Sequence, residues 1–376
     1  MRLQAALLAL SSSALALAAV VTPSHNSRAI DGLSVEVSNA NGPSVASIDD
    51  LVLVSKVTNV GDEPIRVIKY GGLLDAGYLQ SFIVKKDGKD VPFTGIVAQF
   101  GVTYADAALY RTIAPGETVT TEHKVAALYD FKSVGTGEFT FEPLLDRGLD
   151  VGESASRSTG QAHALPTTSV KVAQDVATRV VAESQLDKRA TPQCTTNATQ
   201  LAIIQAAYQD SKLLAATAAS HITVHGTSTL YSRYFKDNPT AAILARYRSV
   251  ADEKVARILS CTDAAFQCPG DVILAYTWTQ TFNVHFCPIF YNQVPSYRLC
   301  SGVNVHQNRI SGATVLHEML HTISMYGQVS ANWIVDITSR GCAASQGLSA
   351  GEQAVNADSF ACLATEVYVN NNCPES

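Results

Sequence analysis

The sequence predicts an α+β chain built in two parts: a β-rich first part, and a mainly helical second part with a small antiparallel sheet. Between residue 30 and about residue 150, short apolar or alternating stretches are separated by turn signals such as Asn-Gly-Pro at 41–43 and Asp-Gly at 87–88. This is the pattern of an antiparallel β-sandwich. The second part instead repeats apolar residues at helical spacing. All 8 cysteines lie after residue 190, so the two parts also differ in cysteine content.

The strands of the first part are expected where apolar residues alternate or run in short blocks. Residues 33–37 and 51–57 have this pattern, and Gly-Thr-Gly-Glu-Phe-Thr-Phe at 135–141 predicts a later strand. A linker is expected from about residue 152 onward.

Besides the helix that carries the motif described next, two helices and one hairpin are expected in the second part. Asn238 precedes Pro239, and proline suits the first position of a helix because an amide hydrogen there would have no partner in any case. Apolar residues then recur at helical spacing over 241–259. Ser-Ala-Gly-Glu at 349–352 has the form of a capping box and predicts a last helix through residue 368. Residues 272–291 are rich in β-branched and aromatic side chains, which favours a hairpin.

The segment His-Glu-Met-Leu-His at 317–321 is the strongest functional motif. Two histidines four residues apart project from one face of a helix and can bind a single zinc ion. Glu318 between them then faces the position of a coordinated water. Apolar neighbours from 313 to 323 are expected to bury this helix. The alternative is an ordinary buried helix whose histidines are satisfied by hydrogen bonds.

A catalytic zinc usually has three protein ligands and a water, so His317 and His321 need a third partner. The metzincin pattern requires Gly at 324 and His at 327, where this chain has Ser and Gly, and is therefore excluded. Asp336, Glu352 and Glu366 remain as candidates, and spacing alone does not choose among them.

Two blocks in the second part resemble a known family. Ala-Thr-Val-Leu-His-Glu-Met-Leu-His at 313–321 and Asn-Ala-Asp-Ser-Phe-Ala at 356–361 resemble the deuterolysin family of secreted fungal zinc endopeptidases, the aspzincins. The likeness continues upstream at 271–276 and 287–291. It implies a zincin-like domain that holds one zinc ion, acts on protein or peptide substrates and uses Asp336 as the third ligand. Asp358 is expected to orient a ligand or to make the substrate pocket acidic.

The chain departs from the family pattern around Asp336. Trp-Ile-Val at 333–335 replaces Gly-Thr, and Ser339 stands where a tyrosine that assists transition-state binding is expected. A catalytically impaired secreted binding protein or effector is therefore the alternative to an active endopeptidase. The intact histidine pair with Glu318 favours the enzyme, because binding alone does not need that glutamate.

The mechanism expected from these residues is hydrolysis by a zinc-activated water. The metal lowers the pKa of the water, and Glu318 takes the proton during attack on the scissile carbonyl and then protonates the leaving amine. His225, His285 and His306 are left without a role, since a lone histidine is more often structural.

The N-terminus predicts secretion. An apolar run over 5–21 with small residues at 16–19 has the form of a signal peptide, assigned to 1–19. No such run recurs, so no membrane span is expected. The net charge of -6 offers no basic patch for nucleic acid.

The even number of cysteines in a secreted segment predicts four disulfides, although sequence alone does not choose the pairing. A cysteine-bound metal is disfavoured because no Cys-x-x-Cys pair exists. The family resemblance implies the pairs Cys194–Cys261, Cys268–Cys287 and Cys300–Cys373, which leaves Cys342 with Cys362.

A dibasic pair, Lys188-Arg189, stands just before the first cysteine and resembles the cleavage signal of a kexin-type processing protease. Cleavage there would separate residues 20–189 from 190–376. The family resemblance makes 20–189 an inhibitory, folding-assisting propeptide; a permanent accessory domain is the alternative. Asn197-Ala-Thr is the one acceptable N-glycosylation sequon.

Overall fold

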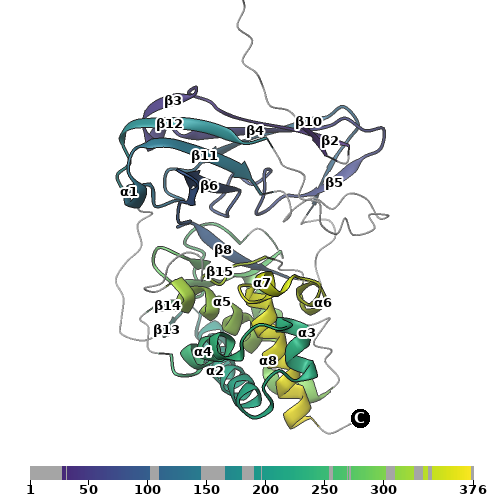
Figure 1. Cartoon of the computed structure of the whole chain (residues 1–376). Helices are drawn as coiled ribbons and strands as arrows, with labels where there is room; N and C mark the ends of the chain where they lie inside the picture. Colours follow the sequence, from purple (N-terminus) through teal and green to yellow (C-terminus); the bar gives the residue numbers. More distant parts are fainter. Residues whose placement is uncertain are drawn as a thin grey trace, which may run out of the picture.

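Two regions make up the chain in this computed structural model, an upper β region and a lower, mainly helical region (Figure 1). The predicted signal peptide 1–19, the Lys188-Arg189 pair and Ser339 lie outside the described residues. The structure describes residues 28–30, 32–101, 110–144, 166–179, 190–195, 197–253, 257–268, 270, 272–301, 310–325, 333–337 and 341–373.

The β region contains two larger sheets that share an apolar core. One has the order β1-β2-β4-β10 and is antiparallel throughout; the other has the order β3-β12-β11-β6-β7, with β3 parallel to β12. A further pair is β5 with β9. The bounds are β1 (Arg28–Ile30), β2 (Leu33–Asn39), β3 (Ser44–Ser47), η1 (Ile48–Asp50), β4 (Val52–Asn59), β5 (Ile65–Ile68), β6 (Phe82–Lys86), β7 (Lys89–Asp90), β9 (Tyr110–Ile113), β10 (Thr118–Lys124), α1 (Phe131–Val134), β11 (Gly137–Pro143) and β12 (Thr168–Asp175).

Strand β12 corrects the expected linker. The linker was predicted to run on from about residue 152, but residues 168–175 pair with β11 and β3. The reason is that Val170 and Val172 alternate with polar residues and are buried in the shared core, which is the two-residue period of a half-buried strand.

The turn predicted at 87–88 is present between β6 and β7. Asp87 and Gly88 both have positive φ, 51° and 75°, and the flanking Lys86 and Lys89 are paired. A two-residue hairpin turn with both central residues at positive φ matches the right-handed twist of the strands, and this explains the Asp-Gly sequence.

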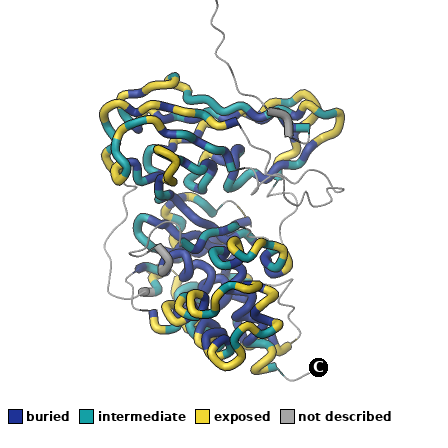
Figure 2. The backbone as a smooth tube through the Cα atoms, in the orientation of Figure 1, coloured by how far each residue is buried: buried dark blue, intermediate teal, exposed yellow. Residues whose placement is uncertain are grey.

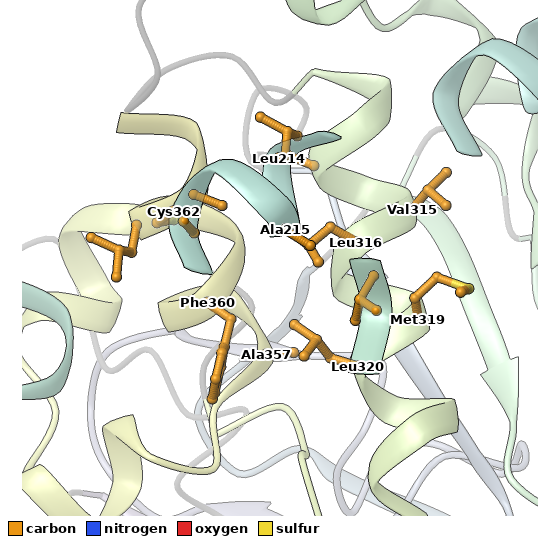
Figure 3. Packing of buried hydrophobic residues seen from close by; sticks show 14 of the residues in the cluster. Leu214, Ala215, Val315, Leu316, Met319, Leu320, Ala357, Phe360 and Cys362 are labelled. Atoms are coloured by element: carbon orange, nitrogen blue, oxygen red, sulfur yellow. The ribbon is translucent and has the colours of Figure 1, made fainter. Parts of the chain in front are cut away.

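The helical region is organised around α5, which packs against α2 and α8. Figure 3 shows side chains of α5, among them Leu316 and Leu320, directed toward Ala215 of α2 and toward Ala357 and Phe360 of α8. The helices are α2 (Ala198–His225), α3 (Thr229–Phe235), α4 (Thr240–Ala251), η2 (Pro288–Asn292), η3 (Ser296–Ser301), α5 (Ser311–Met325), α6 (Cys342–Gln346), α7 (Ala350–Gln353) and α8 (Ala357–Asn372).

A five-stranded mixed sheet lies above α5, where a small antiparallel sheet was expected. Its order is β13-β14-β16-β15-β8, from β13 (Ala190–Gln193), β14 (Arg257–Ser260), β16 (Val284–Phe286), β15 (Ile273–Trp278) and β8 (Ile96–Phe100). The hairpin predicted at 272–291 is confirmed as the antiparallel pair β15 and β16. Strands β13, β14 and β16 are parallel to one another, and β8 comes from the β region (Figure 1).

Two predicted helix boundaries were wrong. The helix expected over 241–259 ends at Ala251, and Leu259 belongs to β14, where it pairs with Val284. Short apolar runs do not distinguish a buried strand from a helix. The capping box of Ser349 and Glu352 is present, but it opens the short α7. The chain then bends to pair with residue 335 before α8 begins.

Four disulfides tie the helical region together, in the pairing that the family resemblance implied. They are Cys194–Cys261, Cys268–Cys287, Cys300–Cys373 and Cys342–Cys362. Within the described parts of the chain, no helix combines the length and apolar character needed to cross a membrane.

Candidate metal and catalytic site

The predicted zinc motif lies on α5, where His317, Glu318 and His321 are all fully buried. The apolar neighbours Leu316, Met319 and Leu320 are also buried and join the core of the helical region. The helix is therefore fixed by packing on several sides, so its polar side chains are held in place rather than free in solvent.

The start of α5 packs too closely on α2 for any side chain at position 312. A Cβ added to Gly312 would lie 2.6 Å from the Cβ of Asp210 and 2.9 Å from the Oγ of Ser296. Contacts this short are not tolerated between real side chains, so the glycine permits the close approach that positions the motif helix.

Asp336 joins the two histidines. Its Oδ1 lies 2.9 Å from the Nε2 of His317 and its Oδ2 lies 3.4 Å from the Nε2 of His321. One ligand atom from each of these residues can be chosen so that all lie within 4.8 Å of one another. Tetrahedral zinc with nitrogen and oxygen ligands at about 2.0–2.1 Å places its ligand atoms roughly 3.3 Å apart. The three side chains thus already lie near a coordinating arrangement.

The segment that carries Asp336 is held against the start of α8. The amide of Val335 donates to the carbonyl of Val355 at 2.8 Å, and the amide of Ala357 donates to the carbonyl of Val335 at 3.0 Å. Backbone pairing on both sides of the preceding residue fixes where the aspartate stands. Ile334, also in this segment, is fully buried.

The two glutamates that were also candidates are engaged elsewhere. Glu352 accepts a hydrogen bond from the amide of Ser349 in the capping box. Glu366 accepts from Arg233 at 2.7 Å and from the hydroxyl of Tyr234. Among the residues that the structure describes, the group His317, His321 and Asp336 is the one set of histidines, cysteines and acids close enough to share an ion.

Each histidine of the group is bonded through the ring nitrogen that faces away from Asp336. The Nδ1 of His317 lies 2.8 Å from Oδ1 of Asp358, and the Nδ1 of His321 donates to the carbonyl of Ile334 at 2.9 Å. A carbonyl can only accept, so the Nδ1 of His321 carries the hydrogen and the lone pair of the neutral ring is on Nε2. This is the usual support of metal-binding imidazoles.

Asp358 is fully buried at the start of α8. Besides contacting His317, its Oδ2 accepts from the amide of Gly341 at 3.2 Å. Of the two expected roles of this residue, the structure places it behind a histidine of the group.

The charges of the group favour a cation. Burial lowers the pKa of His317, but the nearby carboxylate of Asp336 and the charge and hydrogen bond of Asp358 outweigh it and raise the pKa to about 10. The two imidazoles in turn hold the pKa of Asp336 well below its usual range, although burial opposes them. Metal ligands have to be deprotonated, so a bound metal would compete with protons for these side chains.

The inner atoms of the group are not used by the protein itself. The Nε2 of His317 and both carboxylate oxygens of Asp336 are buried and form no hydrogen bond of acceptable geometry. Buried polar atoms are nearly always satisfied, so the chemistry of these atoms fits the role of metal ligands. Two imidazole nitrogens and a carboxylate also form a donor set that suits zinc.

Glu318 has one partner and one open oxygen. The hydroxyl of Thr277 on β15 donates to Oε2 of Glu318 at 2.6 Å, while Oε1 is buried with no hydrogen bond. Burial raises the pKa of Glu318 above its ordinary value, and the imidazoles and Thr277 counteract this in part. Sequence reasoning missed Thr277. Its signal was a hydroxyl in a strand whose residues are otherwise apolar or aromatic, because a polar group there needs a partner.

Gln99 of β8 is a second residue that sequence reasoning missed. Its Nε2 donates to Oδ1 of Asp358 at 3.4 Å across a separation of 259 residues, and no local sequence signal predicts such a contact. Of the unassigned histidines, His285 contacts the carbonyl of Thr262 and stacks on Tyr276. His225 is exposed, and His306 lies outside the described residues.

Comparison with known proteins places these observations in a family. The profile described as the deuterolysin metalloprotease (M35) family matches residues 1–373. A protein of Botryotinia fuckeliana named Neutral protease 2 homolog is 28% identical over 333 residues, covering 85% of this chain and 89% of the relative. Homologs of the same name from Sclerotinia sclerotiorum and Aspergillus oryzae are 28% and 25% identical, covering 86% and 91% of this chain and 89% and 96% of the relatives.

Proposed function

This chain belongs to the deuterolysin metalloprotease (M35) family and is a metalloendopeptidase, and we propose that it is a secreted zinc-dependent enzyme made as an inactive precursor. The observation that carries the proposal is the buried group of His317, His321 and Asp336, with Glu318 on the same helix turn. The substrates proposed are peptide bonds of proteins or peptides.

His317, His321 and Asp336 would hold one zinc ion. When bound, zinc supplies positive charge that lowers the pKa of a coordinated water and stabilises the negative charge developing on the scissile carbonyl. Asp358 and the carbonyl of Ile334 keep the two imidazoles in the orientation that leaves Nε2 free for the metal.

Glu318 acts as the general base. Its Oε1 is open to accept a proton from the attacking water, while Thr277 holds Oε2. A pKa raised by burial brings the carboxylate closer to the operating pH, which favours proton transfer in both directions. The protonated Glu318 then delivers this proton to the leaving amine.

The proposal includes secretion and processing. Residues 1–19 act as a signal peptide, and a kexin-type protease cuts after Lys188-Arg189 and separates a β-sandwich-like propeptide, 20–189, from the metallopeptidase domain, 190–376. Four disulfides are typical of an oxidising, extracellular setting. The domain boundaries and the cut are inferred from the sequence.

Asn197 is proposed as a glycosylation site. It is exposed and caps α2, with its Oδ1 accepting from the amides of Thr199 and Gln200. A glycan attaches through the side-chain nitrogen, so the capping oxygen stays available and the modification is compatible with the helix.

The test is the zinc content of the secreted, processed protein and its hydrolysis of an unfolded protein substrate, compared with Glu318→Gln. The variant should keep the metal and lose activity by a factor of about 10² to 10⁴, because an amide does not accept the proton of the water. A wild-type protein that binds zinc but is as inactive as the variant would instead support the alternative, a secreted binding protein, for which the substitution at Ser339 is the argument.

A further inference from the structure

Strand β8 belongs to the β region by sequence but to the active-site sheet by pairing. It pairs antiparallel with β15, with Val97 opposite Thr277 and Ile96 opposite Trp278. Backbone bonds continue beyond the strand: the amide of Thr279 donates to the carbonyl of Gly95 at 3.1 Å, and the amide of Gly101 donates to the carbonyl of Val272 at 2.8 Å.

Among the described residues, β8 is the strand that pairs with β15 on this side. Its second partner is β16, on the opposite side, in the order β14-β16-β15-β8. Without β8, the backbone N–H and C=O groups of β15 on that side would be unpaired, and an open strand edge readily accepts an extended peptide. Strand β8 therefore covers a ready-made binding edge (Figure 1).

This edge lies beside the candidate general base. Thr277, which pairs with Val97, also donates to the carboxylate of Glu318. An extended chain added to β15 would therefore lie beside Thr277, whose side chain contacts the carboxylate proposed to accept the proton. Strand β8 occupies that path.

Side chains on the two faces of β8 fix it in place. Ile96 and Ala98 are buried in an apolar cluster with Tyr276 and Trp278. Alternate residues of a strand point to opposite faces, and Gln99 reaches Asp358, the carboxylate behind His317. The amide of Gln99 is fully buried and its Oε1 has no hydrogen-bond partner, so the contact with Asp358 is its anchor.

We propose that β8 occupies the substrate-binding edge of β15 in the uncut chain and keeps it inactive, and that extended peptide substrates bind this edge after β8 has left with the β region. This inference rests on the proposed function. It identifies the internal segment that blocks the site and the strand that receives the substrate.

The test uses the full chain in an uncut form, with Lys188→Ala and Arg189→Ala, and measures hydrolysis of a short unstructured peptide. Gln99→Ala removes the buried bond to a carboxylate and should raise the activity of the uncut chain roughly tenfold or more, since weakening the docking of β8 by that factor raises the small undocked, active fraction equally. Gln174→Ala, an exposed glutamine on β12 of the same region, is the matched control and should leave the activity unchanged.

A second variant makes the outcome independent of one hydrogen bond. Ala98→Asp places a charge in the apolar cluster and should release β8 more completely. Hydrogen exchange, measured in the same uncut chain with Glu318→Gln added, should then rise at the amides of β15 and stay unchanged in β2 and β4. This readout needs no catalysis and shows that the β region itself remains folded.

The possible outcomes separate the inference from the function on which it rests. Faster exchange in β15 together with activation of the uncut chain supports the inference. If the processed wild type is active, but the uncut chain stays inactive although β15 has become exposed, the inference is wrong and the proposed function stands. If the processed wild type binds zinc and hydrolyses nothing, the proposed function fails and the inhibitory role of β8 fails with it.

Discussion

The β region and the helical region bury apolar cores of their own but stabilise them by different means. Figure 2 shows buried segments gathered inside each region and exposed ones along the outer edges. The helical region adds four disulfides. The β region has no cysteine and relies on sheet pairing and buried polar contacts, such as Ser55 Oγ with His123 Nε2 at 3.0 Å.

The difference suggests different lifetimes. Disulfides are typical of domains in oxidising, extracellular settings, and the three residues proposed to bind metal are all in the region that has them. The β region supplies a single strand to the site and has no covalent staple. This is the pattern expected if the proposed cut after Arg189 removes the β region, since a region needed only until then has no use for a disulfide.

The largest expected effect follows from the confinement of the metal site to the helical region. Asp336→Ala should weaken zinc affinity by more than about 100-fold, the upper range for loss of a residue that merely supports a ligand, and should abolish hydrolysis. Glu352→Ala and Glu366→Ala are the controls, since their carboxylates are engaged in a capping box and with Arg233. Metal analysis after gel filtration measures the effect. Loss of zinc in Glu366→Ala but not in Asp336→Ala would show that the third ligand is Glu366 on α8.

The disulfides give the next prediction, which separates the regions by stability. Replacing Cys342 and Cys362 by alanine should destabilise the helical region by about 3 kcal/mol, the entropic estimate for a loop of this length, here a separation of 20 residues. Native-state hydrogen exchange should rise in α6 and α8 and remain unchanged in β2 and β4. Equal loss of protection in both regions would mean that they unfold as one unit, and the comparison would no longer hold.

Low pH should destabilise the β region, in contrast to the loss of the disulfide. Burial lowers the pKa of His123 in the β region to about 4, against about 6.5 in an unfolded chain. The unfolded state then binds more protons, so stability is complete above pH 6.5 and falls as the pH is lowered toward 4. The loss at pH 5 is about 2 kcal/mol.

Comparison with His123→Gln isolates this contribution. Asp75, whose pKa is raised by burial, contributes in the opposite direction in both proteins. Wild type should therefore lose more stability between pH 7 and pH 5 than the variant does, as measured by urea unfolding of the β region. Identical pH dependence in the two proteins would show that protonation of His123 does not contribute to the pH dependence of the stability of the β region.

Local patterns predicted the parts of the site that are local. The spacing of His317, Glu318 and His321 needs only one helix, and the family blocks on either side led to Asp336 and Asp358. The helix expected over 241–259 failed at its end because Leu259 is buried in a sheet, and burial looks the same in a short strand as in a helix. Pairing across the sheet, not the segment itself, decides between them.

Contacts between distant segments could not be predicted. Gln99 meets Asp358 across 259 residues, and β8 looks like any other strand of the β region until its partner β15 is known. The same holds for Thr277, whose role depends on which helix packs beneath β15. The roles of these residues can be recognised only when the pairing of the strands in the sheet is known.

The smallest effect concerns the point where sheet and catalytic helix touch. Thr277→Val keeps the volume of the side chain but removes the hydroxyl that donates to Glu318 at 2.6 Å. Zinc content should stay the same, and activity should fall about tenfold, since a hydrogen bond to a charged group contributes roughly 1.5–3 kcal/mol and part of this is recovered by water. Thr365→Val on α8, whose hydroxyl donates within its own helix, is the matched control.

The pH profile of Thr277→Val shows whether the residue acts through Glu318. The hydroxyl lowers the pKa of Glu318, while burial raises it, so its loss should raise that pKa further. A general base works only when deprotonated, and the acid limb of the activity profile should therefore move to higher pH. A tenfold loss at every pH, with no shift of the acid limb, would mean that Thr277 supports the packing of β15 on α5 and not the protonation of the base.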